Sequence, residues 1–290
     1  MSASSKSNRS NRIGALCLLA LIALMLVSNA SARPQQTYRH HNLTVDSLNI
    51  HYRIAGSGPW LLFLHGFTLT GESWEAIAGE FTDSFTVIIP DLPGHGRSGP
   101  FTDTFHYDRA ATLIGGLLDS LSIGQVHGIG HSAGAITLLH LAAIRPEQVR
   151  SLVLVGGGHR FSVEGRKELI EDDFESLDSA TIAFYSDLHP GGPSQIKTIF
   201  DQLNGMARDT SWSVFLSEWL GSIDCPVYLI AGDRDRYFPP EIVSELHNAL
   251  PHRRLWTIPG LGHSPLWEEL GGTAETRNVF PDSVKAFWTD

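Results

Sequence analysis

The feature that most constrains the fold is a series of short apolar runs that alternate with helix-like segments. A continuous apolar run of four or five residues predicts a strand buried on both faces, because a strand with one wet face alternates in polarity. Such runs occupy residues 60–64, 85–89, 126–129, 152–155, 227–230 and 255–258. Helical periodicity occurs at residues 74–81, 108–121, 133–144, 240–250 and 281–288. The alternation predicts an α/β fold with a mostly parallel central sheet flanked by helices.

Two segments depart from this rhythm. Residues 43–54 alternate apolar and polar side chains, which predicts an antiparallel hairpin ahead of the parallel strands. Residues 161–222 contain no buried strand run. We expect them to form a small helical cap inserted after the sixth strand; a long decorated loop is the alternative, and either would roof the pocket. The expected core then consists of residues 33–160 and 223–290.

Prolines and aromatic residues give two further expectations. Pro240 and Pro281 are expected in the first turns of their helices, where the missing N–H breaks no helical hydrogen bond. The aromatic side chains of the cap are expected to pack mainly in its core, with a minority lining the pocket. These residues are Phe184, Tyr185, Phe200, Trp212, Phe215 and Trp219.

The N-terminal segment has the pattern of an export signal. Two arginines precede an apolar run over residues 13–27, and an Ala-Ser-Ala sequence that ends at Ala32 offers a cleavage site. The run is shorter than the roughly 20 apolar residues that span a bilayer, so a retained anchor is the weaker alternative. We expect residues 1–32 to be a signal peptide that is cleaved near Ala32, and the mature chain to be periplasmic or secreted.

The composition narrows the range of partners. The chain has 21 basic and 31 acidic residues, a net charge of −10, and loss of residues 1–32 removes only basic ones. This acidity disfavours nucleic acid and anionic membrane surfaces as partners. We therefore expect a small-molecule substrate and no stable membrane insertion after signal cleavage. Of the two cysteines only Cys225 would remain, as a small buried residue with no disulfide partner.

A candidate nucleophile, Ser132, lies in a Gly-His-Ser-Ala-Gly sequence between a strand-like run and a helix-like segment. A serine on a sharp strand-to-helix turn is exposed to substrate, and the flanking glycines make room for that turn. The neighbouring His131 is expected to point to the opposite face and pack beneath the serine. An ordinary serine N-cap of a core helix is the alternative, and the partners that follow in chain order favour the nucleophile.

Two backbone N–H groups are candidates for holding a negatively charged substrate oxygen. His65-Gly66-Phe67 ends a buried strand, and a sharp bend there can aim the Phe67 N–H at the substrate. The second donor is the N–H of Ala133, directly after the candidate nucleophile.

An acid and a base are also present in the expected order. Asp233 and Asp235 both follow the run at 227–230, and either could orient a base while the other bonds local backbone. His263 lies in a glycine-rich loop after the last strand and could reach back to the serine. Its position distinguishes it among the 14 histidines.

The glycine-rich loop that contains His95 is expected to be structural and to lie near the rim of the site. It lacks the Gly-Lys-Ser/Thr ending of a phosphate-binding loop. The sequence also contains no metal-ligand spacing, so we expect neither a metal nor another cofactor.

Taken together, these stretches resemble the α/β-hydrolase superfamily from about residue 51 to the C-terminus. The matching sequences are Leu64-His65-Gly66-Phe67, Asp91-Leu92-Pro93-Gly94-His95-Gly96-Arg97-Ser98, Gly130-His131-Ser132-Ala133-Gly134, Gly232-Asp233-Arg234-Asp235 and Gly262-His263. The resemblance implies that Ser132 is the nucleophile and His263 the base. It also implies that Asp235, which stands three residues after the strand-end glycine, is the acid.

The same resemblance bears on activity. Haloalkane dehalogenases and soluble epoxide hydrolases of the superfamily carry an aspartate nucleophile, and Ser132 argues against both activities. The Gly-His-Ser-Ala-Gly sequence around Ser132 argues mildly against the proline iminopeptidase branch. We expect hydrolysis of a carboxylic ester of a small, fairly apolar molecule through an acyl-enzyme. The alternatives are a lactonase, a thioesterase, a carbon–carbon bond hydrolase, a cofactor-free perhydrolase, or a non-catalytic ligand-binding protein that reuses the fold.

The signal-peptide hypothesis predicts a mature chain that begins close to Arg33. N-terminal sequencing of the exported protein measures this directly. A product that still carries residues 13–27 would contradict it.

Overall fold

The structure, a computed structural model, describes residues 36–101 and 104–289. The expected signal segment and the side chain of Phe215 lie outside the described residues. The strands are β1 (Arg39–Val45), β2 (Leu48–Gly56), β3 (Trp60–Leu64), β4 (Thr86–Pro90), β5 (Val126–His131), β6 (Val149–Val155), β7 (Val227–Gly232) and β8 (Arg253–Ile258). None of the described helices is long and apolar enough to cross a membrane.

The α-helices are α2 (Glu72–Ala78), α3 (Tyr107–Ser120), α4 (Ala133–Ile144), α5 (Val163–Glu171), α6 (Ser179–Leu188), α7 (Gly192–Arg208), α8 (Ser211–Trp219), α9 (Pro240–Ala249) and α10 (Ala274–Thr289). Short 3-10 helices are η1 (Gly79–Phe81), η2 (Pro146–Gln148), η3 (Phe174–Ser176), η4 (Leu220–Ser222) and η5 (Glu268–Leu270).

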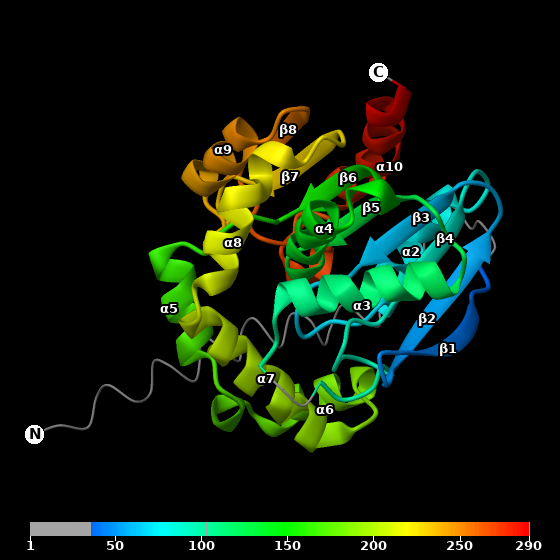
Figure 1. Cartoon of the computed structure of the whole chain (residues 1–290). Helices are drawn as coiled ribbons and strands as arrows, with labels where there is room; N and C mark the ends of the chain where they lie inside the picture. The colour runs from blue at the N-terminus through cyan, green and yellow to red at the C-terminus, as the bar shows by residue number, and fades with distance from the viewer. Residues whose placement is uncertain (1–35, 102–103, 290) are drawn as a thin grey trace, which may run out of the picture.

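The strands form one sheet in the order β1-β2-β4-β3-β5-β6-β7-β8. Strand β2 runs antiparallel to both β1 and β4, and the remaining neighbours are parallel. Figure 1 shows this twisted sheet with helices packed against it. The predicted fold class, a mostly parallel sheet flanked by helices, is confirmed.

Alternate residues of the buried strands pack into two separate cores. In β3, Leu62 and Leu64 belong to the core that contains α3, α4 and α9, whereas Leu61 and Phe63 belong to the core that contains α2 and α10. A strand that buries both faces must be apolar at every position. This requirement explains the continuous apolar runs of the sequence.

Helix α4 is buried around its whole circumference. All of its residues up to Ala143 are buried, and it contacts β3, β5, β6, α3 and α8. A helix that is apolar on every side is stable only inside a large core. Its first residue, Ala133, therefore has little freedom to move relative to the sheet.

The sequence-based start of the last helix is wrong. Helix α10 begins at Ala274, so Pro281 lies inside it and not in its first turn. Thr273 caps the N-terminus of this helix, because its Oγ1 accepts a hydrogen bond from the Thr276 N–H at 3.2 Å. The N-cap interaction and the burial of Phe280 outweigh the hydrogen bond that a proline interrupts.

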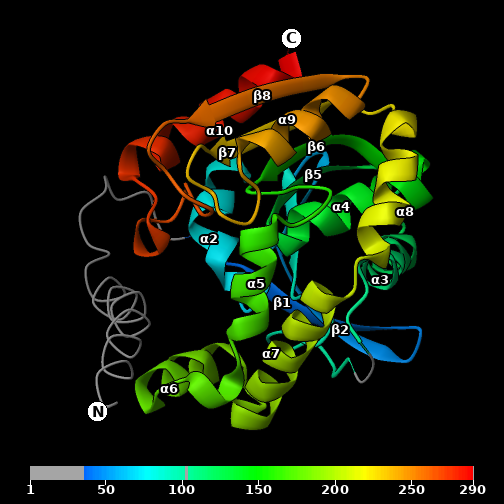
Figure 2. The same ribbon diagram turned by 90° about the vertical axis from the view of Figure 1, so that its left-hand side faces the viewer.

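Helices α5 to α8 lie between β6 and β7 in the sequence. Figures 1 and 2 show α5, α6 and α7 together at one end of the molecule, beyond the sheet. Helix α7 contacts both α5 and α6. Its buried side follows helical spacing through Ile196, Ile199, Phe200 and Leu203.

One buried carboxylate ties several core loops together. Asp91, directly after β4, accepts hydrogen bonds from Arg53 Nη1 at 2.7 Å, Gly71 N at 2.9 Å and Arg97 N at 3.0 Å. His51 Nδ1 lies 2.9 Å from the same carboxylate. Burial alone would raise the pKa of Asp91, but the hydrogen bond from His51 and the charge of Arg53 hold it far below its ordinary value.

Replacing Asp91 by asparagine is therefore expected to lower the free energy of unfolding by about 3 kcal/mol at neutral pH, because Arg53 would lose a buried counter-charge. Since the pKa of Asp91 is depressed in the folded chain, its contribution is complete at neutral pH. The contribution decreases as the pH falls below the ordinary value of 3.8. Urea unfolding at several pH values measures both effects.

Asp46→Asn is the matched control, because Asp46 forms an exposed pair with Arg109. This control should cost about 1 kcal/mol or less. Equal losses for the two variants would contradict the role assigned to Asp91.

Candidate active site

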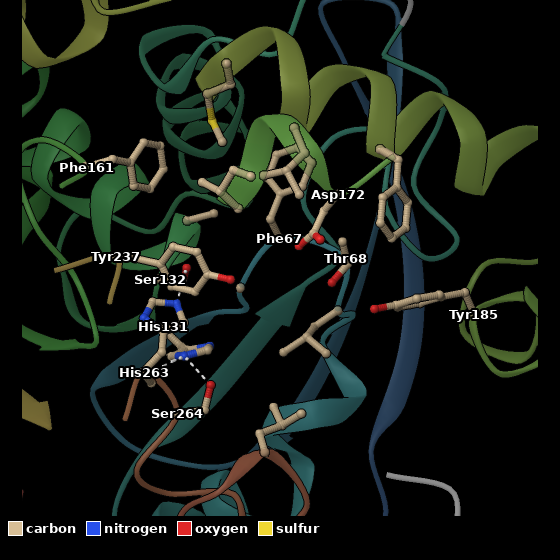
Figure 3. Close-up of a pocket in the computed structure, with 18 of the residues that line it drawn as sticks. Phe67, Thr68, His131, Ser132, Phe161, Asp172, Tyr185, Tyr237, His263 and Ser264 are labelled. Carbon is tan, nitrogen blue, oxygen red and sulfur yellow. Dashed lines mark hydrogen bonds between the residues drawn. The ribbon is translucent and has the colours of Figure 1, made fainter. Parts of the chain in front are cut away.

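A cavity of about 430 Å³ lies where the loops after β3, β5 and β8 meet the helices α5 to α7. Figure 3 shows Ser132, His131 and His263 at one side of it and Phe161, Tyr185 and Asp172 around it. Most of its lining is apolar. Open α/β sheets place ligands at the carboxyl ends of their strands, and this cavity has that position.

Ser132 occupies a strained turn between β5 and α4. Its φ of 52° and ψ of −115° lie in a region that L-residues rarely adopt. The turn brings the start of α4 so close to β5 that a Cβ on Gly130 would lie 2.6 Å from the carbonyl carbon of Gly134. A Cβ on Gly134 would in turn overlap the backbone of Leu64. The glycines on either side of the serine are thus required by this close approach.

Three side chains from distant parts of the sequence form one hydrogen-bonded line. His263 Nε2 lies 2.9 Å from Ser132 Oγ, and His263 Nδ1 lies 2.8 Å from Asp235 Oδ2. A carboxylate accepts only, so the imidazole proton lies on Nδ1 and leaves Nε2 free to accept the serine proton. The geometry is that of a nucleophile, a base and an orienting acid.

The two candidate aspartates have different partners. Asp235 is buried, and its second carboxylate oxygen accepts hydrogen bonds from the N–H groups of Tyr237 and Phe238 at 2.8 and 3.1 Å. Burial would raise the pKa of Asp235, but the charge of His263 and these hydrogen bonds lower it below its ordinary value. Asp233 is exposed and accepts from the Gly260 N–H at 2.6 Å. The structure therefore brings Asp235, and not Asp233, to His263.

His131 is buried beside the line and does not contact Ser132 Oγ through a hydrogen bond. Its Nε2 lies 3.2 Å from Ser264 Oγ and 3.3 Å from the carbonyl oxygen of His263. Burial, with the charge of nearby His263, lowers the pKa of His131 to about 3. A neutral His131 adds no positive charge next to His263, so it does not oppose protonation of the base.

The turn after β3 carries the first expected oxyanion donor. His65 Nε2 accepts from the Leu92 N–H at 2.8 Å, so its proton lies on Nδ1, which donates to the Gly66 carbonyl at 2.8 Å. The C=O and N–H of a trans peptide point in opposite directions. Holding the Gly66 C=O therefore directs the Phe67 N–H away from His65. Both Phe67 and Ala133 line the cavity together with Ser132.

A residue that the sequence analysis did not single out holds the other end of this turn. His189, between α6 and α7, is buried and accepts from the Gly96 N–H at 3.0 Å through Nδ1. Its proton is therefore on Nε2, which donates to the Thr68 carbonyl at 3.0 Å. Burial lowers the pKa of His189, which favours this neutral form. No local periodicity marks such a residue, because both partners come from distant loops.

The expectation that the loop of His95 is structural agrees with its packing. His95 is fully buried, with Nδ1 3.0 Å from the Pro93 carbonyl and its ring against Phe67, which lines the cavity. The expectation for the cap aromatics is wrong. Of the cap aromatics, Phe184, Tyr185 and Phe200 all line the cavity, which is more than a minority of those described. These rings line the same cavity as Ser132, so the insert packs its aromatic side chains toward the site as well as within itself.

Two further expectations concern the cysteine Cys225 and metal binding. Burial raises the pKa of Cys225 to about 12, so this thiol is not a reactive group at neutral pH. Among residues 36–101 and 104–289, no cluster of His, Cys, Asp and Glu side chains is arranged to hold a metal ion.

The chain is similar to several known proteins whose names describe them as an esterase, a lipase and a lactonase. The chain is 28% identical over 239 residues to a pimeloyl-(acyl-carrier protein) methyl ester esterase of Chromobacterium violaceum, covering 75% of this chain and 92% of that protein. It is 26% identical over 250 residues to lipase 3 of a Moraxella species, covering 79% of each. Its fold is similar to the solved structure of an enol-lactonase from Burkholderia xenovorans, with a TM-score of 0.66 and 21% identity over 86% of this chain and 100% of that one.

A family model matches most of the chain. Residues 61–276 match the alpha/beta hydrolase family, a range that includes the strained serine turn, both aspartates and His263. The chain belongs to the alpha/beta hydrolase family.

Proposed function

We propose that this protein hydrolyses a carboxylic ester of a small, fairly apolar molecule through an acyl-enzyme. The observation that carries the proposal is the hydrogen-bonded line from Asp235 through His263 to Ser132, which ends in an apolar cavity. The names of curated relatives, an esterase and a lipase, support ester hydrolysis in general.

In the first half-reaction, Ser132 Oγ attacks the carbonyl carbon of the ester while His263 Nε2 takes the serine proton. Asp235 keeps the imidazole in the required tautomer and stabilises its protonated form. The tetrahedral intermediate then collapses, and His263 returns the proton to the departing alcohol. In the second half-reaction, His263 activates a water molecule that releases the acid and regenerates the serine.

The negative charge of the intermediate develops on the former carbonyl oxygen. The N–H groups of Phe67 and Ala133 are proposed to hold it, since both residues border the cavity next to Ser132. Residues 161–222 are proposed to act as the cap, because α5, α6 and α7 supply much of the apolar lining opposite the serine.

Labelling by a fluorophosphonate probe tests whether Ser132 is the nucleophile. The wild type should be labelled, and Ser132→Ala should lose both labelling and nitrophenyl ester hydrolysis, the latter by on the order of 10⁵- to 10⁶-fold. Ser264→Ala is the control, since Ser264 also lines the cavity but contacts His131. Labelling of Ser132→Ala would contradict the proposal, and an unlabelled wild type would favour a non-catalytic binding protein.

The choice between the two aspartates has its own test. Asp235→Asn should lower kcat by on the order of 10²- to 10⁴-fold, because the imidazole would be left in the wrong tautomer. Asp233→Asn should change kcat far less and affect mainly thermal stability, because Asp233 accepts from the Gly260 N–H in the loop after β8 and has no hydrogen bond to the imidazole of His263. An inactive Asp233→Asn beside an active, folded Asp235→Asn would show that the assignment is wrong.

His189 is proposed as a positioning residue that acts on the reaction through the Phe67 turn. His189→Leu removes the hydrogen bond to the Thr68 carbonyl and should lower kcat by about tenfold or more while KM changes little, since loss of one oxyanion donor costs about 10²-fold. His189→Gln can still accept from Gly96 and donate to Thr68, so it should restore much of the lost rate. Equal kcat values for the two variants would contradict this role.

A further inference from the structure

The carboxylate-bearing residues that line the cavity make its charge negative. Apart from the Ser132–His263 pair, the ionisable side chains that border it include the carboxylates of Asp172 and Glu269. Among the described residues that line the cavity, none is a lysine or an arginine. An anionic end group of a substrate would therefore meet negative charge and no counter-ion within this space.

Asp172 is held by hydrogen bonds at both of its backbone polar groups. It follows the last turn of α5, where its N–H donates to the Glu168 carbonyl at 3.0 Å. Its own carbonyl accepts from Asn204 Nδ2 of α7 at 2.8 Å. These two bonds fix the backbone of Asp172 between α5 and α7.

The carboxylate of Asp172 has no hydrogen-bond or ion-pair partner among the described residues. Burial raises the pKa of Asp172, and the nearby charges of Glu168, Asp173 and Glu171 raise it further. A partly buried carboxylate without a partner is unfavourable, and a ligand group that donates a hydrogen bond or carries positive charge would relieve the cost.

Figure 3 shows Asp172 directed into the cavity, with the oxygen atoms of Thr68 and Tyr185 directed into the same part of it in this view. Ser132 and His263 lie at the other side of the cavity in the same view. In this view the Ser132–His263 pair and the oxygen atoms of Asp172, Thr68 and Tyr185 lie at different sides of a cavity whose lining is mostly apolar.

We propose that Asp172 is a specificity-determining residue that binds a hydroxyl or cationic group at the end of the substrate remote from the ester. The same residue rejects substrates whose remote end is a carboxylate. This inference rests on the proposed ester hydrolysis and adds the chemical class of substrate to it.

Matched nitrophenyl esters test the inference, with acyl chains of several lengths that end in methyl, hydroxyl, trimethylammonium or carboxylate. A second series consists of acetate esters of alkyl alcohols that carry the same end groups, with hydrolysis followed by the acid released, so that either orientation of the ester is sampled. For each ester, kcat/KM is measured with the wild type, Asp172→Asn and Asp172→Leu. Glu171→Gln is the control, because it removes one charge from an exposed neighbour that does not line the cavity. Thermal midpoints identify any variant that fails to fold.

In at least one series, the wild type should prefer the hydroxyl and trimethylammonium ends over methyl, and should reject carboxylate. Asp172→Asn should reduce the cationic preference and the carboxylate rejection by about tenfold, the effect of a hydrogen bond or contact to a charged group. Asp172→Leu should reverse the order in favour of methyl, and Glu171→Gln should leave the order unchanged.

Two outcomes count against separate claims. If methyl-ended esters are hydrolysed through Ser132 but the kcat/KM ratios between end groups are the same in the wild type, Asp172→Asn and Asp172→Leu, the role of Asp172 is overturned and ester hydrolysis stands. If no ester in either series is hydrolysed, the proposed function fails and the inference fails with it.

Discussion

The backbone at Ser132 is the constraint on which the site depends. A serine with φ of 52° is held there only because the surrounding structure leaves no alternative. On one side the Ser132 N–H donates to the Val155 carbonyl at 3.0 Å, and on the other the serine leads directly into the fully buried α4. A strained residue of this kind costs about 1 to 3 kcal/mol. Burial of the apolar α4 residues offsets that cost.

The parallel sheet brings the other groups to the same place. Strands β5, β7 and β8 are parallel, so their carboxyl ends lie at one edge. The loops that follow them supply Ser132, Asp235 and His263, which are widely separated in the sequence. The loop of His263 also packs closely against the backbone after β6. The His263 carbonyl lies so near Gly156, whose φ is 53°, that a Cβ there would overlap it. Removal of water from Asp235 then strengthens its bond to His263.

Local patterns in the sequence predict the frame of this molecule well. Buried strands can be predicted from apolar runs because both of their faces are covered. Helix α4 can be predicted because the Gly-His-Ser-Ala-Gly sequence marks the turn between it and β5. The meeting of Ser132, His263 and an aspartate follows from chain order and strand direction, whereas the choice of Asp235 over Asp233 comes from the family resemblance. The position of Pro281 was missed because tertiary burial and the Thr273 cap outweigh the preference of proline for a first turn.

Features that depend on the approach of the insert to the core could not be predicted in this way. His189 and Asp172 lie in segments without periodicity, and their importance arises only when α5, α6 and α7 meet the loops after β3 and β4. The share of aromatic rings that face the cavity depends on the same packing.

Intact-mass and peptide mass spectrometry after rapid acid quenching tests the central claim most directly. During turnover of a nitrophenyl ester, the account predicts a protein species heavier by one acyl group, with the added mass on the peptide that contains Ser132. The species should be absent in Ser132→Ala. Turnover of the ester by the wild type with no acyl group on Ser132, or with the group on another residue, would contradict the account.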